Sequence, residues 1–219
     1  MRLNKFVASA TGMSRRKADD VIAEGRVKVR NNVAGLGLKV EAKDTVTLDD
    51  KPLHLKENVT IMLNKPVGYI CSRNGQGSQT IYDLLPPELH NLNAVGRLDK
   101  DSSGLLLLTN DGELAYKLTH PSFEKDKVYE IELDKALPAE GKAAIEHGVK
   151  LEDGSSALQL NGKDKKWIVT MSEGRNRQIR RTFEKLDLVV TKLHRIQFGS
   201  YSLADLAKGK YQLQTNDKN

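Results

Sequence analysis

The first quarter of the chain alternates between helical and extended hydrophobic patterns. A first predicted helix is interrupted by residues 11–13. Ser14 is a suitable N-cap for a second helix, which ends at Gly25. Apolar and polar residues then alternate over 27–29 and 45–48, as in short strands. The apolar stripe of the first predicted helix, over residues 2–10, consists of Leu3, Phe6, Val7 and Ala10. Residues 1–57 are therefore predicted to form a small module of two helices and a sheet.

A second and longer region follows a loosely patterned polar segment at 55–58, and we place the boundary between residues 57 and 58. Its first strand is predicted to start at Val59 and to end before Pro66, because proline interrupts strand pairing. Four consecutive leucines, 105–108, then lie between Ser-Ser-Gly and Asn-Asp-Gly. A short apolar run bounded by turn residues predicts a strand buried on both faces.

Further helices and strands alternate through the rest of this region. Strict alternation over 127–133 predicts a half-buried strand with Tyr129, Ile131 and Leu133 on its apolar face. Another strand is predicted at 167–171, and helices are predicted at 113–118 and 138–147. Ile179, Phe183 and Leu186 form the apolar stripe of a last predicted helix.

Composition narrows the class of protein. The chain has 219 residues, of which 38% are hydrophobic and 29% charged, which is enough apolar material for a core. No apolar run approaches the roughly 18 residues that span a bilayer, and no signal-like segment is seen at the N-terminus. The single cysteine excludes an intramolecular disulfide, and the five scattered histidines do not have zinc-ligand spacing. We therefore expect a cytoplasmic protein with no membrane partner and no metal.

The positive charge is unevenly distributed. The net charge is +6, and basic residues concentrate at 14–17, 25–30 and 175–181, as a surface that binds phosphates requires. Arg15, Arg16 and Lys17 occupy the first turn of the second predicted helix, where positive charge opposes the helix dipole unless an anion binds there. The alternative interpretation is a solvated surface turn.

Two residues outside the basic segments are candidates for chemistry. Asp99 lies in a tight loop that leads into the four leucines, so the buried strand would hold its carboxylate rigidly. Alternatively, Asp99 and Asp101 are only turn formers, since aspartate is common in turns. Tyr129 lies on the apolar face of its strand, where a core tyrosine is the simplest interpretation, and its hydroxyl then needs a partner.

The first module resembles the S4 RNA-binding domain. The match is carried by residues 2–6, 14–18 and 25–27. The resemblance implies docking on structured RNA by shape and phosphate contacts rather than by reading base edges. The residues that it implicates in RNA binding are Arg15, Arg16, Lys17 and Arg26.

The whole chain resembles the RsuA/RluB/E/F branch of the pseudouridine synthases. Four motifs occur in that family's order, at 64–68, 96–112, 127–129 and 173–181. The resemblance implies isomerisation of uridine to pseudouridine in ribosomal RNA, without metal or organic cofactor. It also implies an α+β fold: an S4 domain at 1–57, then a catalytic domain at 58–219 with a mixed, mostly antiparallel sheet flanked by helices.

The resemblance also assigns roles to residues of the motifs. Asp99 matches the catalytic aspartate, which could attack the anomeric carbon or remove the 2′ proton. An ionised Asp99 needs a nearby cation, and the resemblance implies Arg180, on the other side of the helix from Arg177 and Arg181. Two further matches are Tyr129, stacked on uracil and a candidate to take the C5 proton, and Arg97, beside the flipped-out nucleotide. Lys65, Arg175, Arg177 and Arg181 are implied RNA contacts, and Asp101 is left as a turn residue.

Two departures from the family's pattern have expected structural effects. Thr182 stands where members usually have Met, which should loosen local packing slightly. Asp187 stands where a Gly often closes the helix, so Asp187 should adopt a left-handed conformation.

The motif at 173–178 favours large-subunit (23S) rRNA as the target. The rRNA is expected either free or in a ribosome-assembly intermediate, and the enzyme is expected to be a monomer. The alternatives are a synthase for small-subunit (16S) rRNA and a non-catalytic RNA-binding assembly factor.

Overall fold

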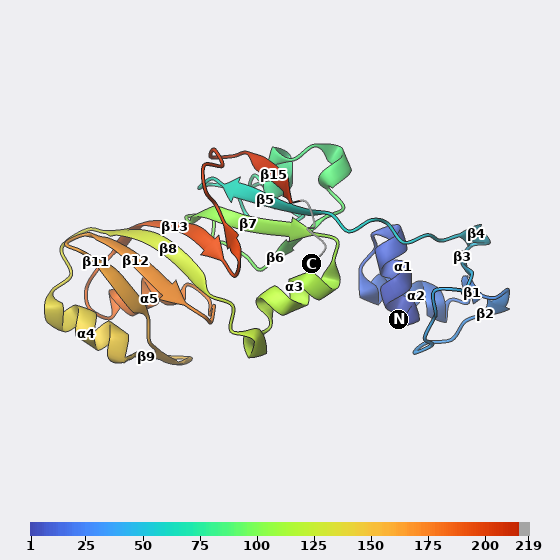
Figure 1. Cartoon of the computed structure of the whole chain (residues 1–219), viewed down its shortest axis with the longest axis horizontal. Helices are drawn as coiled ribbons and strands as arrows, with labels where there is room; N and C mark the ends of the chain where they lie inside the picture. The colour runs from blue at the N-terminus through green and yellow to red at the C-terminus, as the bar shows by residue number, and fades with distance from the viewer. Residues whose placement is uncertain (215–219) are drawn as a thin grey trace. The chain divides into compact units, whose positions relative to one another are not determined.

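The structure is a computed structural model that describes residues 1–214, and residues 215–219 of the predicted second module lie outside this range. The chain forms two compact units, Met1–Val59 and a larger one that begins at Thr60 (Figure 1). Across residues 1–214, no helix has both the length and the apolar character needed to cross a membrane.

The N-terminal unit packs two helices against a small sheet. The helices are α1 (Leu3–Thr11) and α2 (Arg15–Ala23), and the strands are β1 (Val27–Val29), β2 (Asn32–Val33), β3 (Val46–Leu48) and β4 (Lys51–Pro52), in the order β2-β1-β3-β4. Leu3, Val7 and Val27 are buried in the core between them. Ser14 caps α2, since its hydroxyl accepts the backbone N–H of Lys17 at 3.2 Å. The predicted helices, cap and strands are confirmed.

The second unit is built on one large sheet, in which nine strands pair among the described residues (Figure 1). The main path is β11-β12-β8-β13-β7-β5-β15, with β14 beside β13 and β6 beside β7. Only the β13–β7 pair in this sheet is parallel, so the prediction of a mixed, mostly antiparallel sheet in an α+β fold is confirmed. The strands are β5 (Thr60–Lys65), β6 (Asn93–Val95), β7 (Ser103–Thr109), β8 (Lys127–Leu133), β11 (Gln159–Lys163), β12 (Lys166–Met171), β13 (Val190–Phe198), β14 (Tyr201–Ser202) and β15 (Tyr211–Gln214).

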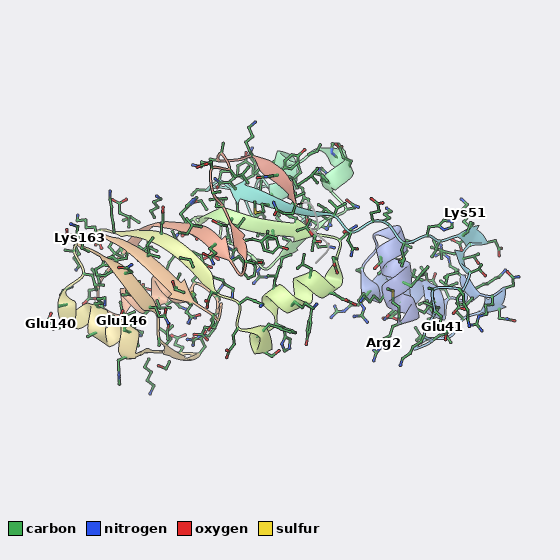
Figure 2. All side chains as sticks on the ribbon, in the orientation of Figure 1. Arg2, Glu41, Lys51, Glu140, Glu146 and Lys163 are labelled. Atoms are coloured by element: carbon green, nitrogen blue, oxygen red, sulfur yellow. The ribbon has the colours of Figure 1, made fainter. Side chains whose placement is uncertain are left out.

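Helices and a hairpin flank this sheet. α3 packs beside β6 and β7, and α5 contacts β13 and β9. Glu146 of α4 accepts the backbone N–H of Leu160 in β11 at 3.2 Å, which joins α4 to the sheet (Figure 2). The elements are α3 (Gly112–Thr119), α4 (Ala139–His147), α5 (Gln178–Glu184), the hairpin β9 (Val149–Leu151) and β10 (Gly154–Ser156), and the 3-10 helices η1 (Ile81–Leu84), η2 (Pro87–Leu89) and η3 (Pro121–Phe123).

Strand β7 is the centre of the unit. Each of its four leucines, 105–108, is 0% exposed, which confirms the prediction of burial on both faces. β5 pairs along one edge of β7, while β6 and β13 share the other edge. Because β7 is paired on both edges and buried on both faces, it provides a rigid base for the loop that precedes it.

The parallel contact between β7 and β13 depends on Gly104. Its φ is +105°, and a Cβ there would lie 2.2 Å from the backbone oxygen of Arg195. We expect Gly104→Ala to lower the free energy of unfolding by about 2–4 kcal/mol, because two backbones must separate and a side chain must adopt an unfavourable φ. Urea denaturation followed by circular dichroism measures this change.

Gly112→Ala is the matched control, since a Cβ at the first residue of α3 meets no described atom within 4 Å. It should change the free energy of unfolding by no more than about 1 kcal/mol. Equal effects of the two substitutions would contradict the close approach at Gly104.

Candidate active site

The loop that carries Asp99 is held from below by a buried lysine. Lys65, the last residue of β5, is 0% exposed. Its Nζ donates to the backbone oxygens of Ser102 at 2.7 Å, Asp99 at 3.0 Å and Pro66 at 3.1 Å. Burial lowers the pKa of Lys65. The expectation that Lys65 contacts RNA is wrong, because its ammonium group is enclosed by the carbonyl groups that it orients.

Other bonds fix the backbone around Asp99 without covering its side chain. The backbone N–H of Gly68 donates to the Lys100 oxygen at 2.8 Å, and that of Ser102 donates to the Asp99 oxygen at 3.1 Å. Cys71 Sγ donates to the Leu98 oxygen at 3.3 Å and accepts the Leu98 N–H at 3.4 Å. The Asp99 side chain keeps 35% of its surface exposed. The carboxylate is thus both fixed and accessible.

Arg177, rather than Arg180, is the arginine within ion-pair distance of Asp99. Arg177 Nη1 lies 3.7 Å from Asp99 Oδ2. The same guanidinium donates to both carboxylate oxygens of Asp101, each at 3.1 Å. Arg177 has φ +47° just before α5, a conformation that is uncommon for a non-glycine residue. The loop conformation, which helical spacing does not predict, brings Arg177 to the acidic loop.

Arg180 braces the same loop through Asp101. Its Nη1 donates to the Val190 oxygen at 2.6 Å and its Nη2 to the Asp101 oxygen at 2.9 Å, while its Nε lies 3.4 Å from Asp101 Oδ2. The expected direct pairing of Arg180 with Asp99 is replaced by this pairing with Asp101. Burial lowers the pKa of Arg180, although the carboxylates of Asp101 and Asp99 oppose the change.

Asp101 is more than a turn residue, which corrects the prediction. It lies in the turn at residues 100–101, but its carboxylate also joins Arg177 and Arg180. Burial would raise the pKa of Asp101, yet the hydrogen bonds from Arg177 and the charges of both arginines outweigh it and lower that pKa. The Asp101 carboxylate therefore stays ionised and keeps two cations beside Asp99.

Arg175 and Arg181 form a separate cluster on the β9–β10 hairpin. Arg175 Nη1 lies 2.9 Å from Asp153 Oδ1, and Arg181 Nη2 lies 2.7 Å from Asp153 Oδ2. Arg181 therefore pairs with Arg175 through a shared carboxylate, and the expected side-by-side placement of Arg177 and Arg181 is wrong. Both predicted RNA contacts are at present occupied by an acidic partner.

Gln178, at the start of α5, organises this segment and was not predicted. It is 2% exposed, accepts the backbone N–H of Arg175 at 3.0 Å and donates to the side chain of Glu173. Its Nε2 also donates to Ser156 Oγ at 3.1 Å. A glutamine within a run of arginines was the available signal, because a long neutral amide there can satisfy several backbone and side-chain groups at once.

The two departures from the family pattern have different outcomes. Asp187 has φ +55°, so its predicted left-handed conformation is confirmed. Thr182 does not loosen the packing as expected: it is 0% exposed, and its hydroxyl bonds the Gln178 oxygen and Ser156 Oγ, each at 2.8 Å. The hydroxyl ties α5 to the β9–β10 hairpin, a contact that a methionine could not make.

A pocket of about 640 Å³ is lined by Asp99 and by four other predicted site residues. Its lining includes Asp99, Arg97, Tyr129, Arg175 and Arg177. Tyr129 is 8% exposed and forms part of the wall from β8. The lining carries three acidic side chains and six basic ones, which are Arg97, Lys125, Lys127, Arg175, Arg177 and Arg195. The pocket lining is therefore net positive, and Asp99 is the acidic side chain in it that comes from the loop held by Lys65.

Arg195 and Lys127, two cations of this wall, were missed at the sequence level. Arg195 is 2% exposed, its Nε donates to the Leu105 oxygen at 2.7 Å, and its guanidinium lies 4.9 Å from the centre of the Phe198 ring. Within the described part of the chain, its Nη2 has no hydrogen-bond partner. Burial and the charge of Arg195 lower the pKa of Lys127, whose Nζ donates to the Ser172 oxygen at 2.8 Å. An arginine within an apolar strand pattern was the signal for Arg195.

The basic residues of the N-terminal unit differ in whether acidic side chains already pair with them. Arg15, Arg16 and Lys17 are exposed in the first turn of α2, as predicted. Arg26, by contrast, donates to Asp49 at 2.6 and 2.8 Å and to Glu24 at 3.1 Å. The hydrogen bonds that Arg26 donates to Asp49 and Glu24 raise the pKa of Arg26. The exposed first turn of α2 is the better candidate for a phosphate contact.

Fold and pocket together indicate a protein that acts on a polyanionic substrate. A fixed carboxylate, a tyrosine wall and a surround of cations suit a polyanionic substrate that places one uncharged group over the acid. Among residues 1–214, no three histidine, cysteine, aspartate or glutamate side chains are grouped so that they could hold a metal ion.

Comparison with known proteins identifies the family. Residues 59–185 match the family model described as RNA pseudouridylate synthase. The chain is 39% identical to the ribosomal large subunit pseudouridine synthase B of Bacillus subtilis, covering 95% of this chain and 89% of that protein. It is 36% identical to an uncharacterized RNA pseudouridine synthase of Aquifex aeolicus, with 97% and 89% coverage. A crystal structure of a pseudouridylate synthase superposes with a TM-score of 0.71 at 32% identity, covering 98% of this chain and 96% of that one. The chain belongs to the pseudouridine synthase family and is an isomerase.

Proposed function

We propose that this enzyme converts a specific uridine of large-subunit rRNA to pseudouridine, with Asp99 acting on a flipped-out nucleotide. The observation that carries the proposal is the partly exposed Asp99 carboxylate, which shares a net positive pocket with Tyr129 and belongs to a loop whose backbone Lys65 holds. The names of its large-subunit relatives support the choice of rRNA.

The first half of the reaction breaks the bond between uracil N1 and ribose C1′. In one route, Asp99 attacks C1′, a bond forms between its carboxylate oxygen and C1′, and the electron pair of the broken bond goes to N1. In the other, Asp99 removes the proton from C2′ while the pair goes to N1, which leaves a glycal. Both routes need an ionised carboxylate within reach of the ribose, and Asp99 is suited to either.

The second half joins C1′ to uracil C5. The detached uracil turns between the walls of the pocket until C5 faces C1′. In the first route, the new C5–C1′ bond displaces the Asp99 oxygen from C1′. In the second route, C5 bonds to C1′ of the glycal while Asp99 returns the proton to C2′. The proton on C5 must then leave, and Tyr129 is the wall residue that we assign to stack on the ring and to accept this proton. The target must be extruded from its stack, because uracil cannot turn inside a helix.

The cations divide their roles by position. Arg177 is assigned to place a positive charge beside the Asp99 carboxylate, and Arg180 to position the loop through Asp101. Arg97 is exposed at the pocket and is assigned to the phosphate beside the target nucleotide. C5 loses a proton, N1 gains one, and any proton taken from C2′ is returned, so the substrate undergoes no net oxidation or reduction and we expect no metal or organic cofactor.

The N-terminal unit is assigned to RNA docking as an S4 domain. Its exposed α2 turn joins three positive side chains to the free backbone N–H groups of a helix start, which suits a phosphate. We place the enzyme in the cytoplasm, acting as a monomer on rRNA or on an assembly intermediate.

Tritium release tests the activity and its target. The wild-type chain is incubated with large- or small-subunit rRNA transcripts labelled with tritium at uridine C5, and an Asp99→Asn chain serves as the blank. We expect release from the large-subunit transcript. Release only from the small-subunit transcript would reassign the target, and no release despite confirmed binding would favour the non-catalytic assembly factor.

Replacing Arg15, Arg16 and Lys17 by alanine should weaken RNA binding by about tenfold near 0.1 M salt. Loss of up to three phosphate contacts should also flatten the slope of log K against log salt by about 2. Filter binding across a salt series measures both quantities. The rate of tritium release from RNA that is already bound to the enzyme should be nearly unchanged, because these residues are not in the second unit, which carries Asp99.

The matched control replaces Lys150, Lys163 and Lys166, which are exposed lysines of the second unit, by alanine. It removes the same charge and should leave the slope within experimental error of the wild type. An unchanged slope in the α2 variant, or the same change in both variants, would show that the α2 turn is only a solvated surface.

A further inference from the structure

Three aromatic rings gather on the surface at the C-terminal end of α3 and in the 3-10 helix η3 that follows, and they are not explained by the reaction. The rings of Tyr116 and His120 lie 4.7 Å apart, those of Tyr116 and Phe123 5.7 Å, and those of His120 and Phe123 6.3 Å. Tyr116 remains 53% exposed and Phe123 40% exposed. We call these three residues the aromatic cluster.

The core does not account for this cluster. The nearby buried residue of α3 is Leu118, which joins a core group with Leu105, Leu107 and Phe198. The cluster residues are not part of that group, and their rings contact one another edge-on or at a tilt while Tyr116 and Phe123 stay exposed. Single exposed aromatic residues are ordinary, but several in contact mark a binding surface.

The cluster lies at the edge of the active-site pocket. The pocket lining includes Thr119, His120, Pro121 and Lys125 from the same segment, so His120 belongs both to the cluster and to the pocket wall. Lys117, directly after Tyr116, and Lys125, two residues after Phe123, are both exposed. Aromatic faces interleaved with cations, continuous with a net positive pocket, are what an unpaired nucleotide requires.

We propose that the aromatic cluster is a stacking subsite for an unpaired base next to the target nucleotide. The proposal rests on the proposed function in one respect, since it takes the substrate to be RNA with one nucleotide in the pocket. Extruding that nucleotide leaves a neighbouring base with an uncovered face, and Tyr116 or Phe123 covers it. Lys117 and Lys125 then meet the adjoining phosphates, so contact depends on unstacking and is largely independent of base identity.

The test uses the full chain and a ten-nucleotide single-stranded oligouridylate with one central 2-aminopurine. Replacing Tyr116 and Phe123 together by leucine keeps apolar bulk and removes the ring faces. We expect the dissociation constant to rise about tenfold and the stacking-induced fluorescence change to be lost. Tyr116→Trp, with a larger face, should bind more tightly than the wild type.

Tyr211→Leu is the matched control, because Tyr211 is 37% exposed on β15 and is not in the pocket lining. It should bind the oligonucleotide as the wild type does. Thermal melting by circular dichroism checks that the leucine variants are folded. Photocrosslinking of the wild-type chain to 4-thiouridine RNA, with peptide mapping, needs no variant and should mark the segment from Tyr116 to Phe123.

Two results would overturn the subsite: unchanged oligonucleotide affinity in the folded leucine variant, or crosslinks that omit this segment. The first would leave the cluster as a local packing feature or a contact for a protein partner. Failure of the proposed function looks different. In that case the wild-type chain releases no tritium from either rRNA transcript, while oligonucleotide binding can still depend on the rings.

Discussion

Asp99→Asn should reduce tritium release by at least about a thousandfold, because an amide can neither attack C1′ nor take the 2′ proton. The substitution keeps the shape of the side chain, and the Lys65 bond to the backbone oxygen of Asp99 does not involve it. RNA affinity should therefore stay within about twofold of the wild-type value, which is about 0.4 kcal/mol. Single-turnover tritium release at saturating enzyme separates this chemical step from binding.

Asp101→Asn is the internal comparison, since Asp101 is an acidic residue of the same loop. Its loss weakens the bonds to Arg177 and Arg180, but it leaves the Asp99 carboxylate in place. We expect a reduction of about tenfold, as for a residue that acts through another. Equal losses in the two variants would contradict the assignment of the chemistry to Asp99.

Lys65→Met should lower the free energy of unfolding by about 3–5 kcal/mol, since it removes a buried charge and leaves three backbone oxygens without their donor. Methionine retains the length and flexibility of the side chain, so the effect is that of the lost ammonium group. Two of the three acceptors flank the active loop, so release per folded molecule should fall as well. Urea denaturation and single-turnover assays below the transition measure the two effects.

Lys163→Met provides the control, because Lys163 is exposed at the end of β11 (Figure 2). It should alter the free energy of unfolding by less than about 0.5 kcal/mol. Wild-type stability in Lys65→Met would show that other bonds hold the Asp99 loop. Reduced stability with unchanged release would show that Lys65 supports the fold without positioning the carboxylate.

The predicted effects describe a site in which residues behind the surface hold the loop that carries Asp99. A buried lysine, Lys65, holds the backbone of the acidic loop, and Asp101 joins Arg177 and Arg180 to the same loop. The arginines of 175 and 181 are bound to the hairpin through Asp153. Several motif residues are thus explained by positioning one carboxylate.

Sequence patterns were sufficient wherever a structure depends on neighbours in the chain. The buried strand at 105–108, the Ser14 cap and the left-handed Asp187 follow from local apolar runs, capping chemistry and backbone preference. The family was also evident from the four ordered motifs. These features need no knowledge of which segments meet.

Pairings between distant segments were not accessible in the same way. Lys65 is 34 positions from Asp99 and Arg177 is 76 positions from Asp101, and no local period relates them. Spacing along α5 grouped Arg177 with Arg181, but the left-handed Arg177 lies outside the helical repeat and contacts the acidic loop instead.

The sequence by itself determined most of the elements and the family, and it singled out Asp99 as the candidate carboxylate. Only the tertiary structure decided which cations serve that carboxylate, that Lys65 is enclosed, that Arg195 lines the pocket, and that three aromatic rings gather at its edge. The physical reason is that hydrophobic periodicity encodes which face of an element is buried. A charged or aromatic side chain, in contrast, takes its role from the groups that the fold places opposite it.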